Sequence, residues 1–210
     1  MATNQSLEQA SRWWPSICIV CNIITIALLM IVFKREGITY REIIGYEKGQ
    51  GNRKDTVAIA LAMLSLGAVG MYGFGFLLYG YMPETMVQPI PVWLACINLL
   101  LFPLTNVFAE LPLYFGYSME GMEKRTGRTR LSIAYITLFY AVQHSFIPLL
   151  ADWKYILYSF LSVLPLVVPL TLYYARKRKL VPLMVGHAVV DLAVAAQILL
   201  ASLSPALFVK

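Results

Sequence analysis

Four ionisable residues of this 210-residue chain stand within long apolar stretches, where titratable side chains are costly. They are both histidines of the chain and two of its 11 acidic residues: Glu110, His144, His187 and Asp191. The other nine acidic residues fall in polar stretches or at the ends of apolar ones. Because ionisable residues within membrane spans usually face a bundle interior or a hydrated cavity, this set predicts a functional site.

A carboxylate and two histidines in a secluded pocket are sufficient to hydrolyse a peptide bond. The carboxylate can take a proton from water as a general base. The histidines can hold that water, donate to a developing oxyanion or protonate the leaving amine, so no nucleophilic serine or cysteine is required. We therefore expect no cofactor. Zinc or another divalent metal at the Glu/His site is the open alternative, although the sequence has no His-Glu-x-x-His motif.

The composition predicts that these residues lie inside a membrane. Hydrophobic residues make up 59% of the chain and charged residues only 13%, which excludes a soluble globular fold. At about 20 residues per span, the length holds five to seven transmembrane helices and no separate soluble domain. The net charge of +6 comes from short basic clusters between apolar runs, which indicates membrane topology and no nucleic-acid partner.

Charge clusters divide the chain into six apolar segments, which predict an all-α polytopic membrane protein. We expect one transmembrane helical domain over residues 1–210. The segments lie at about 13–33, 56–81, 91–117, 131–151, 155–175 and 180–203.

The basic residues predict the orientation of these spans. The first, third and fifth loops hold six, four and four of the 17 lysines and arginines. The positive-inside rule places these loops in the cytoplasm and both termini outside. Four tryptophans fall at the predicted outer ends, as an aromatic belt requires: Trp13, Trp14, Trp93 and Trp153.

The topology also predicts that the four ionisable residues converge. At about 1.5 Å per residue, all four lie roughly 10 to 20 Å below the cytoplasmic surface and can share one cavity that opens to the cytoplasm. His187 and Asp191 are four residues apart on one helix, so the carboxylate can orient the imidazole.

Several further patterns predict contacts between helices. The glycines between Gly67 and Gly80 indicate close packing of the second span. The stretch from Tyr40 to Tyr46 is typical of a short interfacial helix. The amides within spans predict hydrogen bonds between helices, and Gln143 is also a candidate to line the site: Asn22, Asn98, Asn106 and Gln143.

Three stretches of the sequence resemble the motifs of the CPBP intramembrane proteases, which include CAAX-processing endopeptidases and bacteriocin-processing or immunity proteins. That family carries Glu-Glu-x-x-x-Arg, Phe-x-x-x-His and His-x-x-x-Asn/Asp on successive helices. Here the stretches read AELPLYFGY (109–117), FYAVQHSFIPL (139–149) and GHAVVDL (186–192). The resemblance covers about half the chain, with a family-like core at about 91–203.

The first motif departs from the family pattern. In the preferred register Glu110 matches the first glutamate, while Leu111 and Phe115 replace the second glutamate and the arginine. In the alternative register Glu110 is the second glutamate, with Ala109 and Tyr114 at the other two positions. Because the preferred register loses an acid and a base together, it leaves no unpaired buried charge.

The resemblance implies a role for each of the four residues. Glu110 looks like the base that activates water, and His144 like its partner on the water or the product amine. His187 and the residue four positions on look like an oxyanion-stabilising pair. Asp191 replaces an asparagine amide, so it must be protonated or must orient His187.

Three functions remain open. The leading hypothesis is an endopeptidase of a prokaryotic cell membrane, acting on a membrane-associated or lipid-anchored peptide within the bilayer. The degenerate first motif motivates a second, a non-catalytic immunity or scaffold protein in which Glu110→Gln keeps its biological effect. The third is a proton-coupled carrier, which the lack of internal repeats disfavours.

Overall fold

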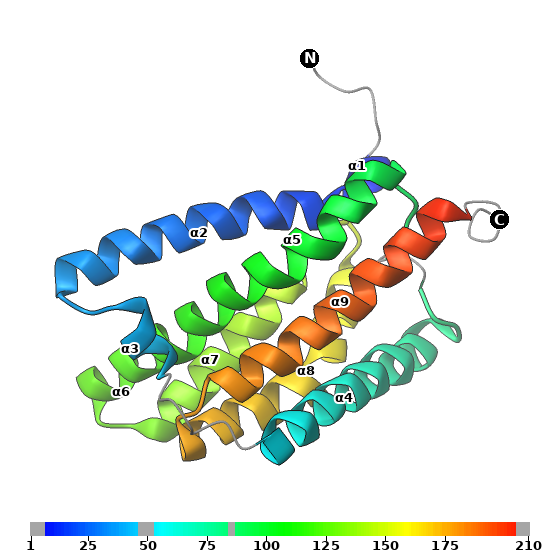
Figure 1. The fold of residues 1–210 in the computed structure, drawn as a ribbon. Coiled ribbons are helices and arrows are strands. Elements are labelled where there is room, and N and C mark those ends of the chain that lie inside the picture. Colours follow the sequence, from blue (N-terminus) through cyan, green and yellow to red (C-terminus); the bar gives the residue numbers. More distant parts are fainter. Residues whose placement is uncertain (1–6, 46–52, 84–86, 205–210) are drawn as a thin grey trace.

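The computed structural model describes residues 7–45, 53–83 and 87–204, and all regular structure in these ranges is helical (Figure 1). This confirms the expected all-α fold. The helices are α1 (Leu7–Ser11), α2 (Trp14–Glu36), α3 (Tyr40–Ile44), α4 (Arg53–Tyr79), α5 (Val92–Leu111), η2 (Pro112–Met119), α6 (Glu120–Thr126), α7 (Thr129–His144), α8 (Trp153–Lys177) and α9 (Val181–Leu203).

Five helical stretches in the described residues are long and apolar enough to cross a bilayer. They are Trp14–Glu36, Arg53–Tyr79, Val92–Thr126, Trp153–Lys177 and Val181–Leu203. Their apolar length and composition support an integral membrane protein.

The expected fourth span, 131–151, was wrong at its end, because α7 stops at His144 after 16 residues. Pro148 lacks a backbone N–H and disfavours helical backbone at the residue before it, which accounts for the early stop. At about 1.5 Å per residue, α7 alone covers roughly 24 Å. The non-helical residues after His144 connect α7 to the start of α8, which lies at the end of the bundle opposite the start of α7 (Figure 1).

The expected third span, 91–117, was too short, because helix continues from Val92 to Thr126. Its middle part, η2, is a π-helix that begins at Pro112. Pro112 has no N–H to donate to the carbonyl of Phe108, four residues earlier. The hydroxyl of Tyr40 donates to that carbonyl instead, and so α3 is tied to α5. The predicted short helix is present as α3, while Tyr46 lies outside the described residues. Its position at a membrane interface stays a prediction.

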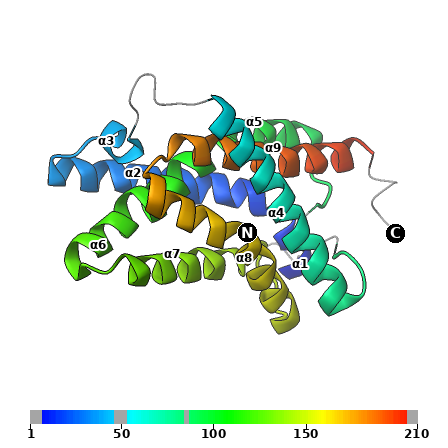
Figure 2. The same cartoon turned by 90° about the horizontal axis from the view of Figure 1, so that it is seen from below.

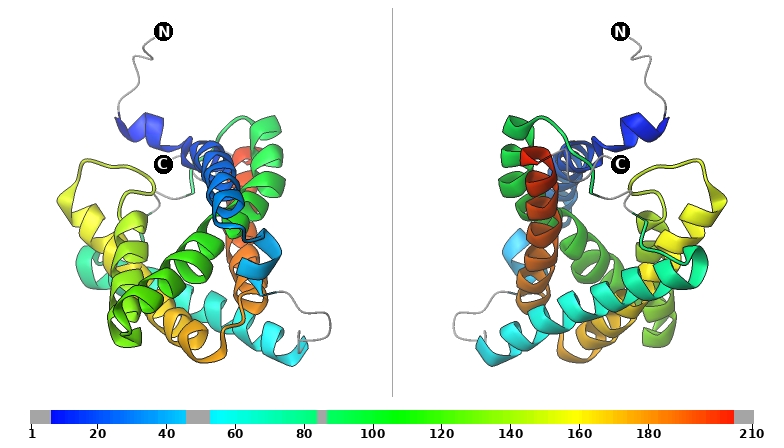
Figure 3. Two further views of the ribbon diagram at one scale, coloured as in Figure 1. Left: turned by 90° about the vertical axis from the view of Figure 1, so that its left-hand side faces the viewer. Right: turned by 90° about the vertical axis from the view of Figure 1, so that its right-hand side faces the viewer.

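The long helices enclose a common interior (Figures 2 and 3). α5 packs between α2 and α9, α4 packs on both α8 and α9, and α7 packs on α8. α2 lies at the periphery, and much of its apolar surface is exposed. This arrangement leaves α5, α7, α8 and α9 with faces toward the interior.

Glycine permits the closest helix contact. A Cβ at Gly70 would lie 1.9 Å from the carbonyl oxygen of Ser162, so α4 and α8 approach as the sequence predicted. At Gly186 a Cβ would lie 2.5 Å from the Met63 sulfur, which brings α9 close to α4. Gly67 and Gly73 have open space at this position, so the packing prediction does not extend to them.

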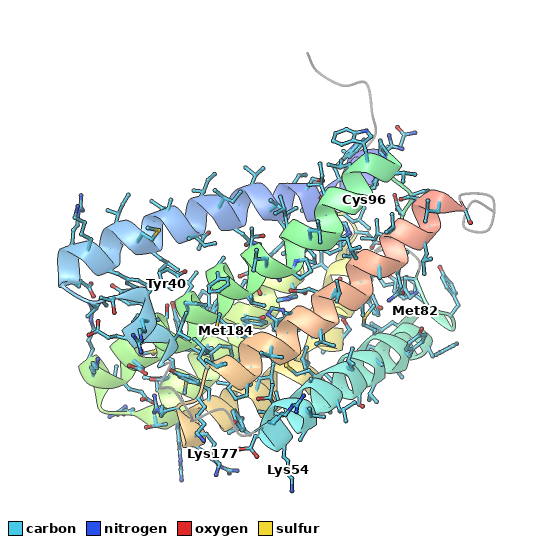
Figure 4. The ribbon with its side chains drawn as sticks, in the orientation of Figure 1. Tyr40, Lys54, Met82, Cys96, Lys177 and Met184 are labelled. Carbon is cyan, nitrogen blue, oxygen red and sulfur yellow. The ribbon has the colours of Figure 1, made fainter. Side chains whose placement is uncertain are left out.

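The two ends of the bundle differ in character. One end, called the basic end, carries Lys34, Lys54, Lys124 and Lys177, two of which are marked in Figure 4. The helices α2 and α8 begin at the opposite end with Trp14 and Trp153, and Trp93 is the second residue of α5 at the same end. Trp93 and Trp153 are exposed, as expected of an aromatic belt, but Trp14 is buried against Phe102 with ring centroids 5.2 Å apart.

Candidate active site

All four ionisable residues predicted to form the site line one cavity of about 130 Å³ inside the bundle, called here the inner cavity. Glu110 comes from the last turn of α5, and His144 is the last residue of α7. His187 and Asp191 lie one turn apart on α9. The helix that carries Glu110 continues to Thr126, beyond the predicted end at residue 117. Glu110 therefore lies farther from the basic end of the bundle than expected.

The carboxylate of Glu110 is buried and is held by two donors from α7. The Tyr140 hydroxyl donates to Oε2 at 2.9 Å, and the Gln143 amide donates to Oε1 at 2.5 Å. The Tyr114 hydroxyl donates to Gln143 Oε1 at 2.5 Å, which fixes the amide with its nitrogen toward Glu110. Each carboxylate oxygen offers about two acceptor sites, so Glu110 keeps capacity to accept from a water molecule.

His187 lies between the two buried carboxylates. Its Nε2 is 3.9 Å from Glu110 Oε2 and 3.6 Å from Asp191 Oδ1, distances within range of an ion pair but too long for a direct hydrogen bond. Its Nδ1 is buried and has no hydrogen-bond partner among the described residues. One polar atom of the ring is therefore left for a group other than the described side chains.

Asp191 is positioned by a chain of amides that crosses three helices. Asn106 Nδ2 donates to Asp191 Oδ2 at 2.9 Å, and Asn22 Nδ2 donates to Asn106 Oδ1 at 3.1 Å. Asn98 accepts from Ser16 at 3.1 Å. These contacts confirm the predicted hydrogen bonds between helices, and they leave the second Asp191 oxygen facing His187.

His144 is half-buried at the end of α7. Its Nδ1 lies 2.8 Å from the carbonyl oxygen of Tyr140, and its ring stacks on the Tyr140 ring with centroids 4.8 Å apart. A carbonyl only accepts, so Nδ1 carries the proton and Nε2 is the basic atom of the neutral ring. His144 thus has a basic nitrogen available on a ring whose orientation is fixed.

Glu110 also lines a second cavity of about 520 Å³, called here the outer cavity. Residues of α2, α5 and the segment 143–149 surround it. Trp14, Cys18 and Ile147 line both cavities together with Glu110. The Glu110 carboxylate therefore stands in the wall between the interior and a larger space bordered by α2.

The two residues that depart from the family's first motif are part of the apolar core. Leu111 and Phe115 are fully buried, and the Phe115 ring lies 5.5 Å from the Tyr174 ring. In the alternative register Tyr114 takes the arginine position. It reaches Glu110 through Gln143, whereas Phe115 has no polar atom to do so.

The metal alternative finds no ready ligand set in this geometry. No group of three or more His, Cys, Asp or Glu side chains among the described residues is placed to hold a metal ion. The three cysteines are free thiols. The expectation of a metal-free site remains a prediction, which chelation tests.

Sequence reasoning missed several partners of the site. Gln143 was a candidate to line the site, but its hydrogen bond to Glu110 was not predicted. Tyr140 was considered only as the aromatic residue of a motif, and its hydrogen bond to Glu110 was not predicted either. Asn106 was expected to bond another helix, not Asp191 in particular. The signal was present in the spacing, since Tyr140 and Gln143 are i and i+3 and share one face of α7.

A family model described as type II CAAX prenyl endopeptidase, Rce1-like, matches residues 91–193, which is 103 of the 210 residues. A comparison with curated proteins finds no match, and a comparison with solved structures finds none either. The matched stretch runs from the start of α5 through Asp191 and includes all four candidate residues. Residues 91–193 are therefore similar to the Rce1-like type II CAAX prenyl endopeptidases, which is consistent with a CPBP/CAAX protease family.

Proposed function

We propose that this protein is an intramembrane endopeptidase that hydrolyses a peptide bond of a membrane-associated or lipid-anchored peptide with a water activated by Glu110. One observation carries the proposal. The Glu110 carboxylate is oriented by two donors, faces His187 Nε2 at 3.9 Å, and lies in the wall shared by the two cavities. A base so placed can meet a substrate that enters through the larger cavity.

In this mechanism Glu110 takes a proton from water as the water oxygen bonds to the peptide carbonyl carbon. His187 stabilises the oxyanion that forms on the carbonyl oxygen, and Asp191 orients His187 rather than acting as a donor. The C–N bond then breaks, and the leaving nitrogen receives a proton from Glu110 or through His144. The proton that Glu110 took from water is the one that the leaving nitrogen receives, so Glu110 is ionised again at the end of the cycle.

The shape of the site supports a route for the substrate. The outer cavity lies beside the peripheral helix α2, so a peptide held at the membrane can reach Glu110 between α2 and the segment 146–149. We further propose that the basic end faces the cytoplasm, in accord with the positive-inside rule.

Mass spectrometry of peptide products tests the proposal. Purified protein in liposomes is incubated with membrane-associated peptides, each with and without a prenyl group, in buffer with or without a chelator. We expect products that are insensitive to chelation, with prenylated peptides cleaved preferentially. Products that vanish with the chelator and return with zinc would contradict the metal-free mechanism but keep the peptidase.

A second candidate, a non-catalytic immunity or scaffold protein, is favoured by one observation. The buried apolar pair Leu111 and Phe115 stands where the family has an acid and a base. This candidate predicts no cleavage of any peptide in the same assay, together with an unchanged biological effect of Glu110→Gln.

A further inference from the structure

A large apolar groove lies between α2, α3, α5 and α9, on a different side of α5 from Glu110. Its volume is about 1210 Å³. We call it the lateral groove. Apolar side chains make up most of its walls, which include Met30, Phe33, Leu104, Phe108, Met184 and Val185.

The lateral groove is separate from the candidate active site. It shares no lining residue with the inner cavity or the outer cavity. On α5, Leu104 and Phe108 face the groove, whereas Asn106 and Glu110 line the cavities. A ligand confined to the groove therefore contacts none of the residues that line the two cavities at Glu110.

Two cations stand at the groove where it approaches the basic end. Lys34, in the last turn of α2, and Arg41, in α3, both line it and are both exposed. Neither forms an ion pair within the part of the chain that the structure describes. The groove thus combines apolar walls with two cations that have no ion-pair partner among the described residues.

The nearby acids are bound to other groups. Glu36 accepts a hydrogen bond from the Tyr117 hydroxyl at 2.7 Å. Glu42 accepts from the backbone N–H of Thr39 at 2.6 Å and from its hydroxyl at 2.8 Å, within a capping box at the start of α3. The backbone and side-chain bonds of Thr39 lower the pKa of Glu42, so this acid stays ionised and held by Thr39.

The position of α3 is fixed against the helix that carries Glu110. Tyr40, which lines the groove, donates to the carbonyl of Phe108 in α5. A Cβ at Gly116 would lie 2.6 Å from a methyl group of Ile43, so only glycine allows α3 to approach η2 this closely. Arg41 is therefore held beside the apolar walls rather than on a free loop.

We propose that the lateral groove binds one anionic phospholipid, with an acyl chain along its apolar walls and the phosphate against Lys34 and Arg41. Basic pockets between transmembrane helices recognise anionic head groups by this combination of charge and apolar surface. A zwitterionic lipid can have the same acyl chains but carries no net negative charge. Lys34 and Arg41 therefore make the groove prefer an anionic phospholipid to a zwitterionic one. The proposal does not depend on peptidase activity.

Native mass spectrometry in detergent micelles measures the binding directly. The purified protein is titrated with phosphatidylglycerol and with phosphatidylcholine of identical acyl chains. We expect tighter binding of phosphatidylglycerol, and about tenfold weaker binding of it by the double variant Lys34→Gln/Arg41→Gln. The matched control, Arg176→Gln/Lys177→Gln, removes two exposed cations at the basic end outside the groove and should bind as wild type does.

A second pair of variants tests the apolar walls without changing charge. Val185→Trp fills the groove from α9, whereas Leu100→Trp introduces the same side chain at an exposed position of α5 outside it. We expect only Val185→Trp to weaken phosphatidylglycerol binding. Equal affinity for both lipids, or unchanged affinity in Lys34→Gln/Arg41→Gln, would overturn the proposal. Displacement of the lipid by a free prenyl alcohol at equimolar concentration would also overturn it, because the groove would then hold a substrate tail.

Discussion

The hydroxyl of Tyr140 donates a 2.9 Å hydrogen bond to Glu110 Oε2, the same oxygen that lies 3.9 Å from His187 Nε2. A residue of α7 thereby aims the α5 carboxylate at the α9 imidazole. Gln143, one turn further along α7, holds the other carboxylate oxygen. The short helix α7 is thus the element that orients the proposed base.

Tyr140→Phe should lower kcat/KM by about tenfold or more. The change deletes one donor to the carboxylate but keeps the ring that packs on His144, and a hydrogen bond to a charged group contributes about 1.5–3 kcal/mol. Cleavage kinetics in liposomes measure the effect. Tyr135→Phe is the matched control, since Tyr135 is exposed on the same helix. Equal losses in both variants would contradict a specific role for Tyr140.

Asn106→Leu should destabilise the protein by about 1–3 kcal/mol, because it leaves the buried Asp191 Oδ2 without its donor. Asn22→Leu removes the outer bond of the amide chain and keeps the Asp191 contact, so we expect it to retain more activity. Unfolding in detergent and cleavage rate are measured for both. An Asn106→Leu protein with wild-type stability and rate would show that this bond does not position Asp191.

Much of the fold could be predicted because the bilayer imposes a simple rule. Runs of about 20 apolar residues must be helical, and charge clusters mark their ends. The predicted segment 180–203 and the observed α9 differ by one residue at the start. The rule fails at α7, where Pro148 ends the helix early, and at η2, where the helix runs on past 117 into residues that are less apolar.

Part of the site could be predicted for the same reason. Helical rise and topology bring residues of similar depth together, and Glu110, His144, His187 and Asp191 do line one cavity. Rotation about each helix axis is set by packing, which spacing within one sequence does not specify. For that reason the pairing of Gln143 with Glu110 and of Asn106 with Asp191 required the structure.

Gly70→Ala should destabilise the bundle strongly, whereas Gly73→Ala should have little effect. The added Cβ at position 70 would lie 1.9 Å from the backbone oxygen of Ser162, so α4 and α8 must separate. At position 73 nothing lies within 4 Å of the added atom. Thermal unfolding in detergent compares the two variants. A stable Gly70→Ala protein with native activity would contradict the close contact between these helices.

Phe115→Arg should prevent accumulation of folded protein, because it places an unpaired cation in the apolar core beside Tyr174. The double variant Leu111→Glu/Phe115→Arg supplies an acid in the adjacent turn and should recover part of the folded yield. Size-exclusion chromatography of the purified variants measures that yield. Equal yields from the single and double variants would show that positions 111 and 115 do not pair. That result would contradict the preferred register of the first motif.

The central claim is that Glu110 activates the hydrolytic water, and the rate of peptide cleavage by Glu110→Gln tests it most directly. General-base catalysis contributes about 10²–10⁴-fold, so kcat/KM should fall at least a hundredfold while thermal unfolding stays close to wild type. Glu36→Gln, at the basic end and outside both cavities, should leave the rate unchanged. Glu110→Asp keeps a carboxylate on a shorter side chain and should retain intermediate activity. Wild-type cleavage by folded Glu110→Gln would contradict the mechanism.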